Sequence, residues 1–144
     1  MDITEYISTR LDVQIAWYEK KSVKAQRLYK RYQVIKIVLS ASIPILSGYT
    51  SNTVIAVLVG TFGSVIAASE AIVKLNKYYE QWIDYRTTSE LLKYHKYLYI
   101  TNSSPYDAAD EARDNLFIRS IESIMSSENN EWKIINIDHI KKMS

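Results

Sequence analysis

Few residues of this chain could carry out acid–base, nucleophilic or metal chemistry. The two histidines, His95 and His139, lie far apart in the sequence, and neither has another metal-ligating residue at helical spacing. The absence of cysteine excludes disulfides, thiolate zinc sites and cysteine nucleophiles. The sequence also lacks a glycine-rich phosphate loop, a nucleophile elbow and a histidine-based triad. We therefore expect no catalytic residue, no metal site and no cofactor.

Glu70 is the one acidic residue next to a long apolar segment, where ionisable residues are functional candidates. A simpler interpretation is an interfacial carboxylate that pairs with Lys36, Lys74 or a tyrosine. Both interpretations place Lys36 and Glu70 as charges at a membrane interface.

The distribution of charge predicts the elements that position these residues. The 33 residues from Ile37 to Ser69 contain no Asp, Glu, Lys, Arg or His, although the chain carries 18 basic and 16 acidic residues. A formal net charge of +2 excludes the strongly basic balance of a dedicated nucleic-acid binder. The length of 144 residues fits one domain, and only three glycines favour long helices over a turn-rich β fold.

The uncharged window divides at a turn-like cluster, residues 48–53, which reads Gly-Tyr-Thr-Ser-Asn-Thr. A helix that crosses the ~30 Å hydrocarbon layer needs about 20 residues. We predict spans over 34–50 and 53–73, the first of which requires Lys36 to extend its ammonium group back to the headgroups. The alternative is a buried hairpin inside a soluble oligomer. A single chain could hardly enclose two segments that are apolar nearly all round.

Lys and Arg residues concentrate just before the first predicted span and just after the second, whereas the turn has no charge. Such a bias places both termini in the cytoplasm. The predicted fold is all-α: an integral, multi-pass inner-membrane protein with a two-span antiparallel helical hairpin. Cytoplasmic helices are expected over 1–33 and 74–100, each continuous with its span. A C-terminal helical segment over 107–142 is expected to start at an Asp107 N-cap and to break at Asn129-Asn130.

A spacing of alternately four and three residues predicts one buried face in each flanking helix. The first series is Ile7, Leu11, Gln14, Tyr18, Lys21, Ala25, Leu28, Tyr32 and Ile35, and the second is Ala71, Leu75, Tyr78, Trp82, Tyr85, Ser89, Leu92, Lys96 and Tyr99. Folding about the turn would bring Trp17 and Tyr18 near Tyr85, Tyr32 near Glu70, and Leu11 near Leu91. We interpret these aromatic residues as packing between helices, because a base-stacking platform would need a basic groove.

Small residues recur every four positions in both predicted spans, which allows close approach of helices in a membrane. They are Ala56, Gly60, Ser64 and Ala68 in the second span and Ser40, Pro44 and Gly48 in the first. Either the two faces meet within one chain, or one packs against a neighbouring subunit. If copies assemble around a pore, Ser40, Ser47, Thr61 and Ser64 are the expected lining.

Three short motifs resemble those of the SLATT superfamily, the SMODS- and SLOG-associating two-transmembrane effector domains. Residues 7–21, ISTRLDVQIAWYEKK, resemble its entry motif. Residues 82–86 (WIDYR), 89–93 (SELLK) and 97–99 (YLY) resemble its post-membrane motif, and the tail around Phe117, Ile121-Glu122, Ser127-Glu128 and Trp132 is also similar. Arg86 and Glu90 lie in these motifs and join Trp17, Tyr18, Trp82 and Tyr85 as the expected cytoplasmic seam.

The resemblance implies a bacterial inner-membrane protein of conflict or antiphage systems, in which nucleotide-signalling enzymes or sensor proteins act as partners. It also implies oligomeric pores that permeabilise the membrane, and it attaches no catalytic residues. The resulting hypothesis is a non-enzymatic homo-oligomeric pore-forming effector that contacts the lipid bilayer and no nucleic acid. The alternative is a membrane-anchored helical scaffold that binds partners without forming a pore.

Overall fold

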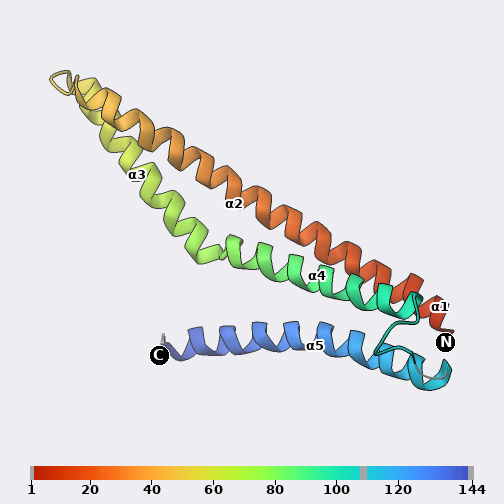
Figure 1. Ribbon diagram of the computed structural model, residues 1–144. Coiled ribbons are helices and arrows are strands. Elements are labelled where there is room, and N and C mark those ends of the chain that lie inside the picture. The colour runs from red at the N-terminus through yellow and green to blue at the C-terminus, as the bar shows by residue number, and fades with distance from the viewer. Residues whose placement is uncertain (1, 108–109, 143–144) are drawn as a thin grey trace. The chain divides into compact units, whose positions relative to one another are not determined.

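The computed structural model describes residues 2–107 and 110–142, with side chains described in 2–107 and 110–127. Every regular element in these ranges is helical (Figure 1). The elements are α1 (Ile3–Tyr6), the π-helical turn η1 (Ile7–Leu11), α2 (Asp12–Ser47), α3 (Thr53–Asn76), α4 (Tyr78–Ile100) and α5 (Asp110–Lys142). The predicted all-α class is confirmed.

The turn predicted in the uncharged window lies between α2 and α3. The amide of Tyr49 donates to the carbonyl of Leu46 at 2.9 Å, which closes the end of α2. Asn52 then caps α3, because its side-chain oxygen accepts from the amide of Val54 at 2.9 Å. α2 continues through Pro44 and stops at Ser47.

The chain forms two compact parts, which we describe separately. The hairpin part, Lys21–Asp84, contains most of α2, all of α3 and the first residues of α4. The terminal part combines Met1–Lys20 with Tyr85–Ser144. The terminal part holds the main buried core, which consists of Tyr6, Leu11, Ile15, Tyr18, Leu92, Tyr99, Tyr106, Phe117, Ile121 and Met125.

Lys77 corrects the expectation of one uninterrupted helix from the second span into the cytoplasm. Its backbone adopts the left-handed conformation (φ 49°, ψ 41°), so α3 ends at Asn76 and α4 begins at Tyr78. The break shifts the helical phase: Val73 is buried, whereas the predicted seam residue Leu75 is 84% exposed. The sequence contains no Gly or Pro here to signal the break.

α5 differs from expectation in its middle. It is described from Asp110 onward, and the two residues that follow the expected N-cap Asp107, 108 and 109, lie outside the described residues. The helix runs without interruption through Asn129 and Asn130 to Lys142, so the break predicted there is wrong. The polar pair is compatible with a helix because tertiary context commonly overrides the modest helix propensity of asparagine.

Candidate functional site

The apolar hairpin of α2 and α3 buries one narrow stripe on each helix. The less exposed positions again follow steps of four and three. They are Tyr29, Tyr32, Lys36, Leu39, Ile43 and Leu46 in α2, and Ile55, Val59, Phe62, Ile66, Ser69 and Val73 in α3. Most are only half-buried, as expected where two helices cover each other along one face.

The rest of the hairpin surface is apolar and exposed. Ile45 of α2 is 71% exposed and Val57 of α3 is 62% exposed, with further exposed Val and Ile residues around both helices. This surface coincides with the 33 residues that carry no charge. A contiguous exposed apolar surface on this scale is typical of contact with a membrane or another protein.

Among the described residues, one helical stretch is long and apolar enough to cross a membrane. It begins at Thr53, and only 6% of its apolar window is buried. The other predicted span, 34–50, does not qualify, because α2 ends at Ser47 and its last 18 residues include the charged Lys30, Arg31 and Lys36. Its 14 helical residues, 34–47, extend about 21 Å against the ~30 Å of a hydrocarbon layer.

Lys36 and Glu70 lie at the charged end of the apolar hairpin and form an ion pair between α2 and α3. Lys74 adds a second contact, 3.7 Å from the Glu70 carboxylate on the same helix. The pairing interpretation of Glu70 is therefore correct. The Lys36 side chain is 15% exposed, so its charge is directed to Glu70. The ring of Tyr32, a residue expected near Glu70, stacks on that of Tyr78 with ring centroids 6.1 Å apart.

The small-residue faces of the two helices do not meet within the chain. Ala56, Gly60, Ser64 and Ala68 are all exposed, as are Ser40, Pro44 and Gly48. A Cβ atom added at Gly60 would meet nothing within 4 Å. No contact with a described residue therefore requires a small side chain at that position.

Three of the four hydroxyl groups expected to line a pore are bonded within their own helices, the exception being Ser40. Thr61 donates to the carbonyl of Val57 at 2.8 Å, and Ser64 donates to the carbonyl of Gly60 at 3.1 Å. Ser47 donates to the carbonyl of Pro44 at 2.8 Å. These bonds satisfy the donors, so the residues can face either water or an apolar partner.

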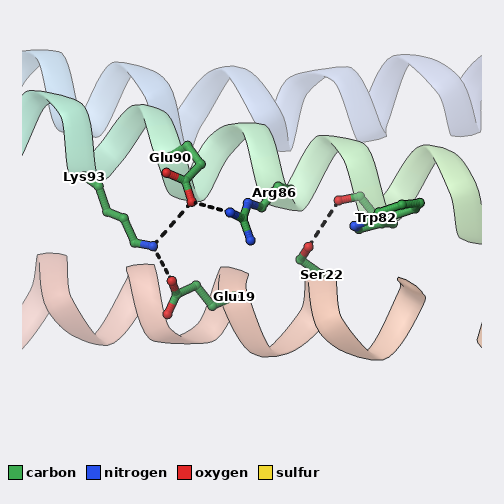
Figure 2. Close-up of polar contacts among 6 residues, drawn as sticks. All are labelled: Glu19, Ser22, Trp82, Arg86, Glu90 and Lys93. Carbon is green, nitrogen blue, oxygen red and sulfur yellow. Dashed lines mark hydrogen bonds and ion pairs between the residues drawn. The ribbon is translucent and has the colours of Figure 1, made fainter. Parts of the chain in front are cut away.

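Aromatic residues occupy the charged end of the hairpin part. The Tyr29 ring lies 5.3 Å from that of Tyr79 and 6.3 Å from that of Trp82, and Lys30 lies over the Trp82 ring at 5.8 Å. The buried hydroxyl of Ser22 donates to the Trp82 carbonyl at 3.3 Å (Figure 2). Aromatic rings with polar tips suit a membrane–water interface.

The terminal part contains the other half of the predicted seam. The Tyr85 ring lies 5.8 Å from that of Trp17 and 6.2 Å from that of Tyr18, so the predicted pairing of these residues is confirmed. Lys93 forms an ion pair with Glu19 and lies 3.4 Å from Glu90 (Figure 2). The hydrogen bond to Glu19 raises the pKa of Lys93.

Arg86 and Glu90 form an ion pair along α4 at 3.1 Å, and both side chains are exposed. This pair belongs to the polar margin of the seam and does not cross to α2. Lys96 does cross, because its ammonium lies 2.5 Å from the Asp12 carboxylate. The core position expected for Leu91 is occupied by Leu92, which is fully buried together with Leu11.

The predicted seam of the N-terminal helix is wrong at Gln14, Lys21 and Ile35. Leu11, Tyr18 and Ala25 are buried as expected, but Ile15 and Ser22 are buried in place of Gln14 and Lys21. Lys21 is therefore exposed, and the buried polar residue of this seam is a small serine.

No group of three His, Asp or Glu residues in the described parts of the chain could hold a metal ion. His95 donates or accepts a 2.5 Å hydrogen bond with the Tyr106 hydroxyl, and burial lowers its pKa. His139 lies outside the residues whose side chains are described.

The family model described as a protein of unknown function (DUF4231) matches residues 13–114, which is 102 of the 144 residues. The chain belongs to the DUF4231 family. The DUF4231 match begins with α2 and ends inside α5, so it includes the apolar hairpin and the aromatic seam. No curated protein and no solved structure matches the chain.

Near the end of the DUF4231 match, Tyr99 of the predicted seam and Phe117 of the tail motif form an aromatic core with Tyr106, for which the sequence predicted no role. The Tyr99 ring stacks on Phe117 at 4.3 Å, and Tyr106 meets Phe117 edge to face at 5.4 Å. Tyr106 and Phe117 are fully buried. Tyr99 donates to the Asp114 carboxylate at 2.5 Å, and burial together with this bond raises the tyrosine pKa.

Glu122 lies eight residues beyond the end of the DUF4231 match and belongs to the tail motif. It accepts bonds from Arg10 and Tyr6 and so fixes α5 to the N-terminal helix. In the sequence, the available signal is the position of Glu122 next to the apolar Ile121.

Proposed function

We propose that the chain is a non-enzymatic, oligomeric membrane protein that acts as a pore-forming effector in a bacterial conflict system. The observation that carries the membrane assignment is the exposed, uncharged surface of the hairpin around Ile45 and Val57. Transfer of apolar surface out of water is worth about 25 cal/mol per Å². The transfer of this surface from water into the hydrocarbon layer of a membrane is therefore strongly favourable.

The length of α3 fits one span, and the other proposed span needs residues beyond the end of α2. The 24 residues of α3 extend about 36 Å, enough for a hydrocarbon layer of ~30 Å. The apolar part of α2 is shorter, and the uncharged turn of residues 48–52 would complete the second crossing. Local bilayer thinning accommodates short segments at modest cost. The basic residues on both sides of the hairpin favour cytoplasmic termini in the inner membrane.

Assembly of several copies is supported by the outward position of the small residues. A single hairpin cannot enclose a path for water, so a pore needs several subunits. Gly60 and Ala68 are exposed, and a Cβ at Gly60 would meet no neighbour in the chain, which favours packing of α3 against a second copy. Ser40, Ser47, Thr61 and Ser64 remain the proposed lining.

The effector role rests on the resemblance of the three motifs to the SLATT superfamily. A nucleotide-signalling or sensor protein would then supply the trigger. No catalytic or cofactor-binding role is proposed for any residue.

Ion leakage from proteoliposomes tests the pore. We expect wild-type oligomers to release a trapped dye or dissipate an ion gradient, and Gly60→Leu to abolish leakage because the larger side chain prevents close packing of α3. Val65→Leu is the matched control, since it also enlarges an exposed α3 residue but lies off the small-residue face. Inserted wild-type oligomers that never leak would refute the pore.

The second candidate function is a membrane-anchored scaffold without a pore. It is favoured by exposed aromatic residues on α4 in the terminal part, where Tyr94 and Tyr97 are both largely exposed. Under this hypothesis, Tyr94→Ser with Tyr97→Ser would abolish toxicity or signalling in cells, whereas Gly60→Leu would leave it unchanged. The pore hypothesis predicts that Gly60→Leu abolishes toxicity.

A further inference from the structure

The face of α2 opposite its buried stripe carries a second series with the same alternating spacing. Its members in chain order are Lys20, Lys24, Arg27, Arg31, Val34, Val38, Ala41 and Ile45, and all are exposed. The series is basic up to Arg31 and apolar from Val34 onward. At 100° per residue these positions lie on one side of the helix.

The basic side chains of this series have no ion-pair partner among the described residues. No described residue forms an ion pair or hydrogen bond with Lys24, Arg27 or Arg31. In contrast, Lys36 is paired with Glu70. The outward face of α2 therefore carries positive charge that no described residue neutralises.

We propose that Arg27 and Arg31 form a binding site for the phosphate groups of anionic phospholipids. The proposal rests on the membrane insertion proposed above and deepens it. A ligand that meets Arg31 and extends toward the apolar end of this face lies beside Val34 and Val38. A phosphate attached to hydrocarbon chains, as in a phospholipid, has this arrangement, whereas a nucleic acid offers phosphate without the apolar continuation.

The rise per residue of the helix gives the distance of each basic residue from the start of the apolar face at Val34. With 1.5 Å per residue, Arg31 lies about 5 Å and Arg27 about 10 Å from Val34 along the axis, and Lys24 lies about 15 Å away. The headgroup layer of one leaflet is roughly 5–8 Å thick, and electrostatic attraction decays over a Debye length of ~8–10 Å. Arg31 and Arg27 are thus within reach of the headgroups, and Lys24 is largely screened.

Spin-label electron paramagnetic resonance on the full chain in bilayers tests the site. Phosphatidylglycerol and phosphatidylcholine, each spin-labelled on the acyl chain, are compared in equimolar vesicles of the two unlabelled lipids. The ratio of their association constants at the protein surface is the readout. We expect wild type to prefer phosphatidylglycerol, and Arg27→Gln with Arg31→Gln to lower the ratio by roughly fivefold per charge.

The matched control is Lys20→Gln with Lys24→Gln, which removes the same charge from the same face farther from Val34. We expect it to change the ratio by less than about twofold, because of screening. Arg27→Lys with Arg31→Lys keeps the charge and should keep the preference. Equal losses in the two glutamine pairs would overturn the site and indicate a diffuse charge effect.

Two further outcomes would separate this inference from the proposed function. Each variant is first tested for resistance to carbonate extraction from the vesicles. Wild type that is extracted refutes membrane insertion and the lipid site with it, whereas inserted wild type without lipid preference refutes the lipid site alone. Retardation of a single-stranded oligonucleotide by wild type but not by Arg27→Gln with Arg31→Gln would assign the stripe to nucleic acid and overturn the proposal.

Discussion

Glu122 links α5 to the start of the chain, and its replacement should release that helix. Its carboxylate accepts two bonds from Arg10, from Nε at 2.5 Å and Nη2 at 2.7 Å, and one from the Tyr6 hydroxyl at 2.8 Å. All three residues belong to the terminal part. Glu122→Ala removes every one of these bonds, whereas Glu122→Gln retains an acceptor for Tyr6 and removes the charge.

The magnitude follows from the exposure of each partner. The Arg10 and Glu122 side chains are 50% and 39% exposed, so the ion pair is worth only about 1 kcal/mol. Tyr6 is buried, and loss of its acceptor adds about 1–3 kcal/mol. We therefore expect Glu122→Ala to lower the free energy of unfolding by about 2–4 kcal/mol and Glu122→Gln by about 1 kcal/mol.

The same contacts predict a pH dependence. The hydrogen bond from Arg10 holds the pKa of Glu122 below its usual range. The stabilisation is fully present above the unfolded-state pKa of ~4.3 and is lost as the pH falls through the lower folded-state pKa. Wild type should thus lose stability in this acidic window, and Glu122→Gln should lose less because it has no carboxyl group to protonate.

Hydrogen–deuterium exchange of residues 110–127 measures whether α5 separates from the N-terminal helix. Thermal unfolding in detergent measures the change in the free energy of unfolding. Arg10→Ala, combined with Glu122→Ala in a double-mutant cycle, isolates the ion pair. Equal losses for Glu122→Ala and Glu122→Gln would contradict the role assigned to Tyr6. Unchanged exchange of α5 in Glu122→Ala would refute the attachment altogether.

Three further predictions concern single positions. Lys77→Gly should raise the free energy of unfolding by about 1 kcal/mol in thermal or chemical denaturation, because glycine tolerates φ 49°. Lys77→Ala should not raise it, and equal effects of the two substitutions would show that the left-handed backbone of Lys77 is not strained. Ser89 is fully buried, and its hydroxyl has no partner among the described residues. Ser89→Ala should therefore raise the free energy of unfolding by about 1 kcal/mol in the same denaturation experiment. A lower free energy of unfolding would show that the hydroxyl has a hydrogen-bond partner. Burial lowers the pKa of His95, so stability should decline as the pH falls below ~6.5 toward the folded-state pKa, and His95→Gln should flatten this decline in melting temperatures measured across pH.

Several features could be predicted from the sequence because they depend on local composition. The uncharged window, the turn around Asn52 and the helical class all follow from residue types along the chain. The pairing of Lys36 with Glu70 could also be anticipated, because two opposite charges at the margins of adjacent apolar segments gain by pairing.

Two corrections required the tertiary structure. In α2, the heptad pattern allowed either Gln14 or Ile15, and either Lys21 or Ser22, because neighbouring stripes on a helix share half of their positions. Only the helix packed against α2 decides which stripe is buried. At Lys77 the left-handed backbone separates α3 from α4, although the sequence has no Gly or Pro there to signal a break.

The sequence alone determined that this chain has an apolar, helical middle between charged flanks, since charge and hydropathy are properties of single residues. The tertiary structure decided which faces remain uncovered: the small-residue face of α3 around Gly60 and the basic-to-apolar face of α2 at Arg31 and Val34. The reason is physical, because exposure depends on what each helix packs against, and a periodic pattern fixes the spacing of a stripe but not its partner.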